Sequence, residues 1–127
     1  MNTDNCVLLI DDELDTLKLY KLKLALDGYQ VITATEGSKG IERASTEKPK
    51  VIVLDLKMPG MDGFEVLKNL QGEATTKNIP KIILSNFDNP RVIENCLQLG
   101  AKEYLVKSQV TPEEVSAVIT RQIEKPL

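Results

Sequence analysis

The stretch Val51–Gly63 reads V-I-V-L-D-L-K-M-P-G-M-D-G and joins a short apolar run to a carboxylate and then to a turn. Four consecutive branched apolar residues without polar alternation predict a strand buried on both faces, as in a parallel sheet covered by helices. Because an ionised carboxylate is costly to bury, we expect Asp55 at the carboxyl end of that strand, where open α/β sheets form their crevices. After a proline-glycine turn, Asp62 and Glu65 have the capping-box spacing for a helix that begins at residue 63 or 64.

Strands and helices are predicted to alternate along the whole chain. Apolar runs predict strands at 6–10, 30–35, 51–54, 81–84 and 104–106. Helical spacing, caps and terminating glycines predict helices at 14–27, 37–45, 64–70, 90–99 and 112–123. This alternation is typical of an α/β fold with a three-layer, doubly wound parallel sheet and right-handed crossovers.

Two of the predicted helices carry apolar stripes whose burial depends on the fold. In helix 14–27, one stripe is expected to pack on the sheet and consists of Leu14, Leu17, Tyr20 and Leu24. For a second stripe we favour wide contact with the core over an exposed docking surface, and it consists of Leu19, Leu22 and Leu26. In helix 90–99 the expected buried residues are Val92, Ile93, Cys96 and Leu97.

Length and composition restrict the class of protein. A chain of 127 residues is one domain of ordinary size, able to bury a core without disulfides or a structural metal. The net charge of −3 and the pI of about 5.0 argue against nucleic acid as a direct partner, because phosphate binding normally needs a basic patch. Since the chain has no histidine, Ser-His-Asp and Cys-His sites and imidazole-based zinc sites are excluded.

The sequence also bears on location. No stretch is long and apolar enough to span a bilayer, so no membrane association is expected. Cys6 and Cys96 lie inside apolar runs, and no apolar leader precedes a cleavage site. We therefore expect a cytoplasmic chain with two buried, reduced thiols.

Polar residues end four of the predicted strands. Asp11 and Asp12 follow the first strand, Asp55 the third, Ser85 the fourth and Lys107 the fifth. Since the carboxyl ends of parallel strands share one edge of a sheet, we expect these side chains to converge in one crevice.

The chemistry of that set indicates phosphoryl transfer. Carboxylates held together repel one another unless a hard cation neutralises them, and Mg²⁺ prefers oxygen ligands. A magnesium ion, a lysine and a hydroxyl around one carboxylate can hold the charge of a phosphoryl group in transfer. We therefore predict that Asp55 is a nucleophile that forms an acyl phosphate.

These residues resemble the receiver domain of two-component response regulators over nearly the whole chain. The motifs are Asp11-Asp12 after the first strand, D-L-K-M-P-G-M-D-G around Asp55, Ser85, and G-A-K-E-Y-L-V-K up to Lys107. Each motif is weak alone, but their order and spacing together are highly specific. The resemblance implies a single receiver domain over 1–127, flavodoxin-like, with strand order 2-1-3-4-5 and five helices.

The resemblance also implies a metal site. Asp55 would be the phosphoacceptor, and Mg²⁺ would be held by Asp12, Asp55 and the backbone carbonyl of Lys57. Asp11 would act on the ion through water.

Further roles follow from the same resemblance. Ser85 would contact one phosphoryl oxygen and Lys107 another, and Tyr104 matches the family's aromatic switch position. The phosphodonor would be a histidine kinase or a histidine phosphotransfer protein, and the switched surface would contact a downstream protein target. The chain would be a monomer or a phosphorylation-dependent dimer, and it would be no enzyme, since it would catalyse only its own phosphorylation and dephosphorylation.

The sequence departs from the family pattern at one point. The family's lysine is usually followed by a proline through a cis bond, whereas Ser108 follows Lys107 here. A cis bond before a residue other than proline costs about 2.5–4 kcal/mol. The alternatives are a trans loop that moves Lys107 slightly and a cis loop that bears this strain.

Several alternatives compete with a stand-alone receiver. An aspartate-based phosphatase of the haloacid dehalogenase type needs a second Asp two residues after the nucleophile, where this chain has Lys57. A flavodoxin-like cofactor binder places its phosphate after the first strand, where acids here would repel it. A purely structural interaction domain is a third alternative. The fourth is a receiver excised from a longer DNA-binding regulator or hybrid kinase.

Overall fold

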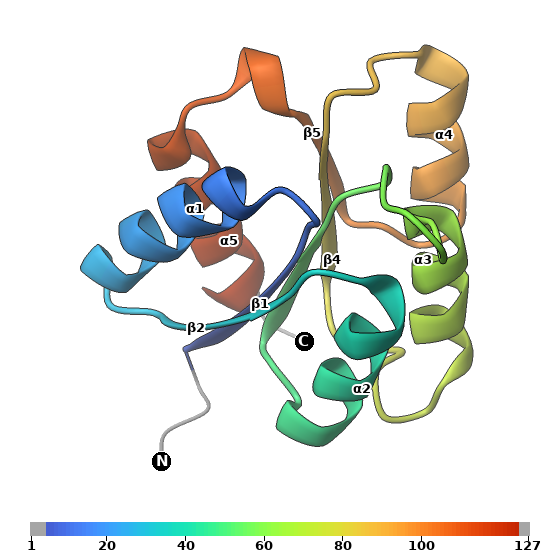
Figure 1. Cartoon of the computed structure of the whole chain (residues 1–127), viewed down its shortest axis with the longest axis horizontal. Helices are drawn as coiled ribbons and strands as arrows, with labels where there is room; N and C mark the ends of the chain where they lie inside the picture. Colours follow the sequence, from blue (N-terminus) through green and yellow to red (C-terminus); the bar gives the residue numbers. More distant parts are fainter. Residues whose placement is uncertain (1–4, 125–127) are drawn as a thin grey trace.

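The structure is a computed structural model that describes residues 5–124 (Figure 1). A five-stranded parallel sheet has the order β2-β1-β3-β4-β5. Its strands are β1 Cys6–Ile10, β2 Gln30–Ala34, β3 Val51–Leu54, β4 Lys81–Ser85 and β5 Glu103–Val106. The helices are α1 Leu14–Leu26, α2 Gly37–Glu47, α3 Gly63–Gly72, α4 Pro90–Gln98 and α5 Pro112–Glu124, with a short 3₁₀ helix at Lys107–Gln109. The predicted fold class and strand order are confirmed.

Helices cover both faces of the sheet, as a doubly wound fold requires. α1 and α5 lie on one face, and α2, α3 and α4 lie on the other (Figure 1). Each face of the sheet has its own hydrophobic core, and alternate residues of β1 belong to one or the other. Val7 and Leu9 pack toward α1 and α5, while Leu8 and Ile10 pack toward the other three helices. All four residues of β3 are buried, which explains its unbroken apolar run.

Three helix N-termini have side-chain caps, among them the one that the sequence predicts at α3. Asp62 Oδ1 accepts a hydrogen bond from the backbone N–H of Glu65 at 3.0 Å and starts α3. The Asn89 side chain accepts one from the N–H of Arg91 at 2.8 Å and starts α4. At α5, Thr111 and Glu114 cap each other's backbone N–H groups at 3.0 and 3.1 Å. These bonds satisfy donors that a helix end would otherwise leave unpaired.

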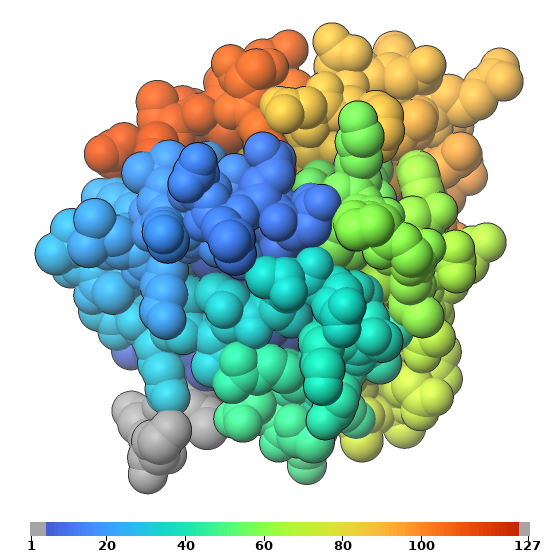
Figure 2. Space-filling model, in the orientation of Figure 1, coloured from blue at the N-terminus to red at the C-terminus, as the bar shows by residue number. Residues whose placement is uncertain are grey.

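The expected burial of the apolar stripes is partly wrong. In α1 the inward side consists of Leu17, Tyr20 and Leu24. Leu14 is 61% exposed because it is the first residue of α1, and the outer leucines are 51%, 62% and 75% exposed at Leu19, Leu22 and Leu26. A helix that lies on a sheet buries one side only, and within residues 5–124 no other element covers the outer side of α1 (Figure 2). The favoured wide core contact is therefore corrected to an exposed apolar surface.

In α4, only part of the expected stripe is buried. Cys96 is fully buried and Val92 packs against the same core, whereas Leu97 is 45% exposed. Leu97 lies about 100° around the helix from Cys96, so one cannot face the sheet squarely without the other turning outward.

Other expectations concern the thiols, the membrane and the lysine loop. Cys6 and Cys96 are buried and free, and burial raises the pKa of Cys96 to about 11. Within residues 5–124, no helix has the length and apolar character needed to cross a membrane. The described peptide bonds contain no cis bond, so the bond between Lys107 and Ser108 is trans.

Candidate phosphoacceptor site

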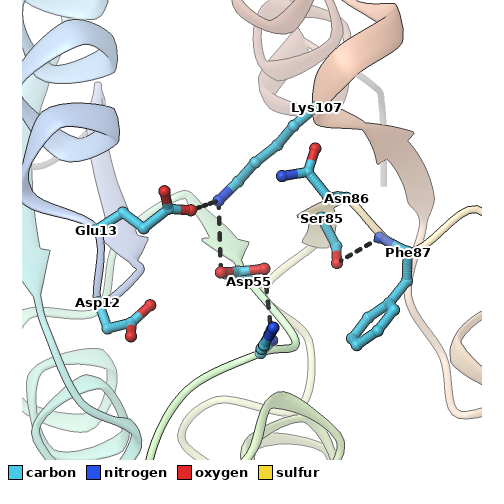
Figure 3. A pocket seen from close by; sticks show the side chains of 8 residues that line it. Asp12, Glu13, Asp55, Ser85, Asn86, Phe87 and Lys107 are labelled. Carbon is cyan, nitrogen blue, oxygen red and sulfur yellow. Dashed lines mark hydrogen bonds and ion pairs between the residues drawn. The ribbon is translucent and has the colours of Figure 1, made fainter.

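One pocket lies at the carboxyl edge of the sheet, where the loops after β1, β3, β4 and β5 meet (Figure 3). Its lining residues are Asp12, Glu13, Asp55, Lys57, Ser85, Asn86, Phe87 and Lys107. Of the strand-end residues that the sequence predicts, Asp12, Asp55, Ser85 and Lys107 line this pocket. Asp11 is not a lining residue, but its carboxylate contacts Lys107, so the set converges as the parallel topology requires.

Asp55 is held firmly by the backbone around it. Its N–H donates to the carbonyl of Ile10 at 2.9 Å, and its Oδ1 lies 3.5 Å from the N–H of Lys57. α3 begins against this segment, because a Cβ on Gly63 would lie only 2.4 Å from the carbonyl oxygen of Asp55. Glycine at position 63 thus lets the helix pack directly on the residue that presents the carboxylate.

Three carboxylates gather around this point. Asp11, Asp12 and Asp55 each offer an oxygen, and these oxygens lie within 4.8 Å of one another. Burial, followed by the nearby Asp11, raises the pKa of Asp55. This all-oxygen, carboxylate-rich donor set suits a hard divalent cation such as Mg²⁺, whose charge would relieve the repulsion.

Lys107 offsets part of this negative charge. Its Nζ donates to Asp11 Oδ2 at 2.7 Å and to Glu13 Oε1 at 3.0 Å, and it lies 3.4 Å from Asp55 Oδ2. Burial alone lowers the pKa of Lys107, but the hydrogen bonds to Asp11 and Glu13 outweigh it and hold that pKa above its ordinary range. The ammonium therefore stays charged at neutral pH and reaches the carboxylate of Asp55 from the residue that follows β5.

Ser85 and Tyr104 are linked through one loop residue. Ser85 is buried, and its Oγ accepts a hydrogen bond from the backbone N–H of Phe87 at 3.2 Å. The Tyr104 hydroxyl donates to the carbonyl of Phe87 at 2.7 Å. Tyr104 does not line the pocket, but this bond ties it to the loop that follows Ser85.

Sequence reasoning missed three lining residues. Glu13, Asn86 and Phe87 line the pocket, and Glu13 bonds to Lys107. Each follows a predicted site residue directly or by two positions in the chain, so proximity along the loop was the available signal. Their side chains were not predictable because loop direction after a strand depends on the whole fold.

Comparisons with known proteins identify the family. Residues 7–120 match the family model described as the response regulator receiver domain. PhoP, the alkaline phosphatase synthesis transcriptional regulatory protein of Bacillus subtilis, is 37% identical over 111 residues, which are 87% of this chain and 45% of PhoP. The chain thus spans less than half the length of that relative.

Two further similarities cover most of both chains. The two-component response regulator ORR3 of rice (Oryza sativa) is 33% identical over 120 residues, which are 94% of this chain and 91% of ORR3. A chain in the crystal structure of the CheX–CheY–BeF3–Mg²⁺ complex from Borrelia burgdorferi is 26% identical, with a TM-score of 0.85 over 95% of this chain and 90% of that chain. With its strand order, its strand-end pocket and its match to the family model, this chain belongs to the response regulator receiver domain family.

Proposed function

We propose that this receiver domain accepts a phosphoryl group on Asp55 in a magnesium-dependent reaction, and that the modification switches a surface that binds another protein. The observation that carries the proposal is the meeting of Asp12, Asp55, Ser85 and Lys107 in one pocket. These groups supply a nucleophile, a cation site, a hydroxyl and a fixed positive charge, which are the elements of phosphoryl transfer.

The residues have complementary parts in this reaction. A carboxylate oxygen of Asp55 attacks phosphorus while the bond from phosphorus to the donor's imidazole nitrogen breaks, and the electron pair leaves with that nitrogen. Lys107 and the Ser85 hydroxyl stabilise the charge on the transferred oxygens. Asp12, Asp55 and the Lys57 carbonyl would hold Mg²⁺, with Asp11 acting through water, and the ion would neutralise charge on the phosphoryl group.

The phosphodonor is proposed to be a histidine kinase or a histidine phosphotransfer protein, and the output is proposed to be contact with a downstream protein. Similarity to a chain crystallised with BeF3 and Mg²⁺ supports the metal and the modification. Turnover of external phosphate esters is not proposed, because Lys57 stands where a phosphatase of the haloacid dehalogenase type has its second Asp. The cytoplasmic location stays a prediction.

Two contexts remain for the domain. We propose a stand-alone regulator, which similarity to ORR3 over 91% of its length supports. Similarity to part of the longer PhoP supports the alternative of a receiver within a DNA-binding regulator or hybrid kinase. The open reading frame beyond residue 127 decides between them, and sedimentation with and without phosphorylation decides between a monomer and a phosphorylation-dependent dimer.

Intact-mass spectrometry after incubation with acetyl phosphate and Mg²⁺ tests the central proposal. We expect the wild-type protein to gain one phosphoryl group, and we expect neither Asp55→Asn nor wild-type protein in EDTA to gain it. Asp62→Asn is a matched control because Asp62 caps α3 outside the pocket lining. Equal phosphorylation of the Asp55→Asn protein would contradict the assignment.

A further inference from the structure

Glu13 stands between the acidic pair of β1 and the first residue of α1. Its Oε1 accepts a hydrogen bond from Lys107 Nζ at 3.0 Å, whereas Asp55 Oδ2 lies 3.4 Å from the same nitrogen. Figure 3 shows Glu13 and Ser85 on opposite sides of Asp55, with the Lys107 ammonium on the Glu13 side. The ammonium is therefore drawn away from the side of the pocket where Ser85 lies.

Nothing in the local fold requires this contact. Glu13 is the N-cap residue of α1, yet its side chain makes no capping hydrogen bond and is 57% exposed. Asp11, by contrast, is buried and uses Oδ1 to accept a bond from the N–H of Glu13 at 2.9 Å. Within residues 5–124, Lys107 is the partner of the Glu13 carboxylate.

Glu13 also lies outside the carboxylate cluster. The three acids whose oxygens lie close together are Asp11, Asp12 and Asp55, and two of these also contact Lys107. A divalent cation held by that cluster would compete with Lys107 for Asp11 and Asp55. Of the three carboxylates that contact Lys107, Glu13 is then the one that stays available.

We propose that Glu13 is a positioning residue for Lys107. Its carboxylate holds the ammonium on the α1 side of the pocket until a phosphoryl group on Asp55 takes the place of Glu13 as the partner of Lys107. This inference rests on the proposed function. A phosphoryl group carries close to two negative charges and three acceptor oxygens, so it outcompetes one exposed carboxylate for the ammonium. Because Glu13 is the exposed partner of this ion pair, solvent weakens its hold on Lys107, and Glu13 opposes phosphoryl binding modestly rather than blocking it.

Glu13→Gln tests the proposal because it removes the charge and keeps the size of the side chain. With Mg²⁺ at saturation, we expect Glu13→Gln to bind beryllofluoride, a mimic of the phosphoryl group, roughly two- to fivefold more tightly than wild type, the range for one exposed ion pair. A second readout needs no metal or phosphoryl group. In EDTA, acetylation of Lys107 by an N-hydroxysuccinimide ester, followed by peptide mass spectrometry, should be faster in Glu13→Gln.

Two controls separate the contact from general electrostatics. Asp15→Asn removes the same charge from an exposed acid in the first turn of α1 that does not line the pocket. It should change both readouts less than Glu13→Gln does. In a Lys107→Met background, the effect of Glu13→Gln on beryllofluoride affinity should fall to that of Asp15→Asn.

The possible results are distinguishable. Equal effects of Glu13→Gln and Asp15→Asn, or an effect of Glu13→Gln that persists in Lys107→Met, would overturn the inference. If the wild-type protein binds beryllofluoride and Glu13→Gln binds it with the same affinity, the inference about Glu13 fails while the proposed function stands. A wild-type protein that binds no beryllofluoride in Mg²⁺ would overturn the proposed function, and this inference with it.

Discussion

Lys81 is a charged residue in the core, away from the pocket. It is 1% exposed, and its Nζ donates to Gln71 Oε1 and to the carbonyl of Thr76, both at 2.6 Å, and to the carbonyl of Lys77 at 3.0 Å. These three acceptors take all the protons of an ammonium group and belong to the end of α3 and the loop that follows it. Lys81 thus ties this loop to the start of β4.

Lys81→Met should destabilise the fold. Methionine keeps the apolar stem but removes the donor to Gln71 Oε1 and to the Lys77 carbonyl, while the Thr76 carbonyl keeps its bond from the N–H of Ile79. The loss of these bonds costs about 1–3 kcal/mol in the free energy of unfolding. Lys102→Met is the matched control, since Lys102 is exposed and should change that free energy by less than about 0.5 kcal/mol. Urea unfolding of the three proteins checks this, and equal stability of wild type and Lys81→Met would contradict it.

The difference in stability between wild type and Lys81→Met should depend on pH. Burial, followed by repulsion from Lys102, lowers the pKa of Lys81 from 10.5 to about 8. Between these values the unfolded chain binds more protons than the folded one, so stability contributed by Lys81 rises with pH across this window and is constant below it. The difference between wild type and Lys81→Met should therefore widen as the pH is raised from about 8 to 10.5.

Residue positions in the pocket were more predictable than residue contacts. Asp12, Asp55, Ser85 and Lys107 meet because each ends a strand, and strand ends can be read from apolar runs. The bond between Glu13 and Lys107 joins residues 94 positions apart, and no periodicity encodes such a pair. The chemical roles of these residues stay predictions until phosphorylation is measured.

At the scale of elements, α1 has an apolar outer surface formed by Leu19, Leu22 and Leu26. Hydropathy alone could not distinguish this stripe from a second core contact, because both require leucines at helical spacing. What decides is whether a neighbouring element covers the outer side, and in residues 5–124 none does. α1 begins beside the acidic pocket, since Leu14 directly follows the lining residue Glu13, so we propose the stripe as a docking surface for the phosphodonor protein.

Leu22→Ser should separate docking from chemistry. Phosphoryl transfer from a histidine phosphotransfer protein should slow, because an exposed apolar contact is lost, while phosphorylation by acetyl phosphate should be unchanged. Stability should change by less than about 0.5 kcal/mol, since Leu22 is 62% exposed. Radiolabel transfer and urea unfolding measure the two effects.

The buried Leu24 provides the comparison within α1. Leu24→Ala should cost about 2–5 kcal/mol in the free energy of unfolding, because Leu24 has no exposed surface and its removal leaves a cavity. If Leu22→Ser slowed transfer from the protein donor and from acetyl phosphate equally, the docking proposal would fail.

At the scale of the whole molecule, the fold was predictable because several signals agree. Apolar runs that alternate with capped helices along the chain predict parallel strands, and the resemblance to the family implies the strand order that the structure has. The observed helix and strand ends differ from the predicted ones by at most two residues, as at α2, which continues to Glu47 rather than to Ser45. The unpredicted parts are those set by contacts between distant elements.

The global switch is the last prediction, and it depends on the two bonds to Phe87. Ser85 Oγ accepts from the N–H of Phe87, and the Tyr104 hydroxyl donates to its carbonyl. A phosphoryl group on Asp55 should draw the Ser85 hydroxyl toward itself, which weakens its bond to Phe87 and vacates space behind β4. Tyr104 on β5 can then leave the Phe87 carbonyl and turn inward, so α4, β5 and α5 form the surface that changes.

Amide chemical shifts on adding beryllofluoride and Mg²⁺ test this mechanism. We expect changes near Tyr104 and Val92 as well as around Asp55, and we expect the distant changes to shrink in Ser85→Ala, which lacks the hydroxyl. Two packings of one core compete, so the ligand shifts their populations only as far as its contacts differ between them, and a partly shifted spectrum before addition also fits. Chemical-shift changes confined to the neighbourhood of Asp55 would rule the mechanism out, because the ligand would then not alter the environment of Tyr104 or α4.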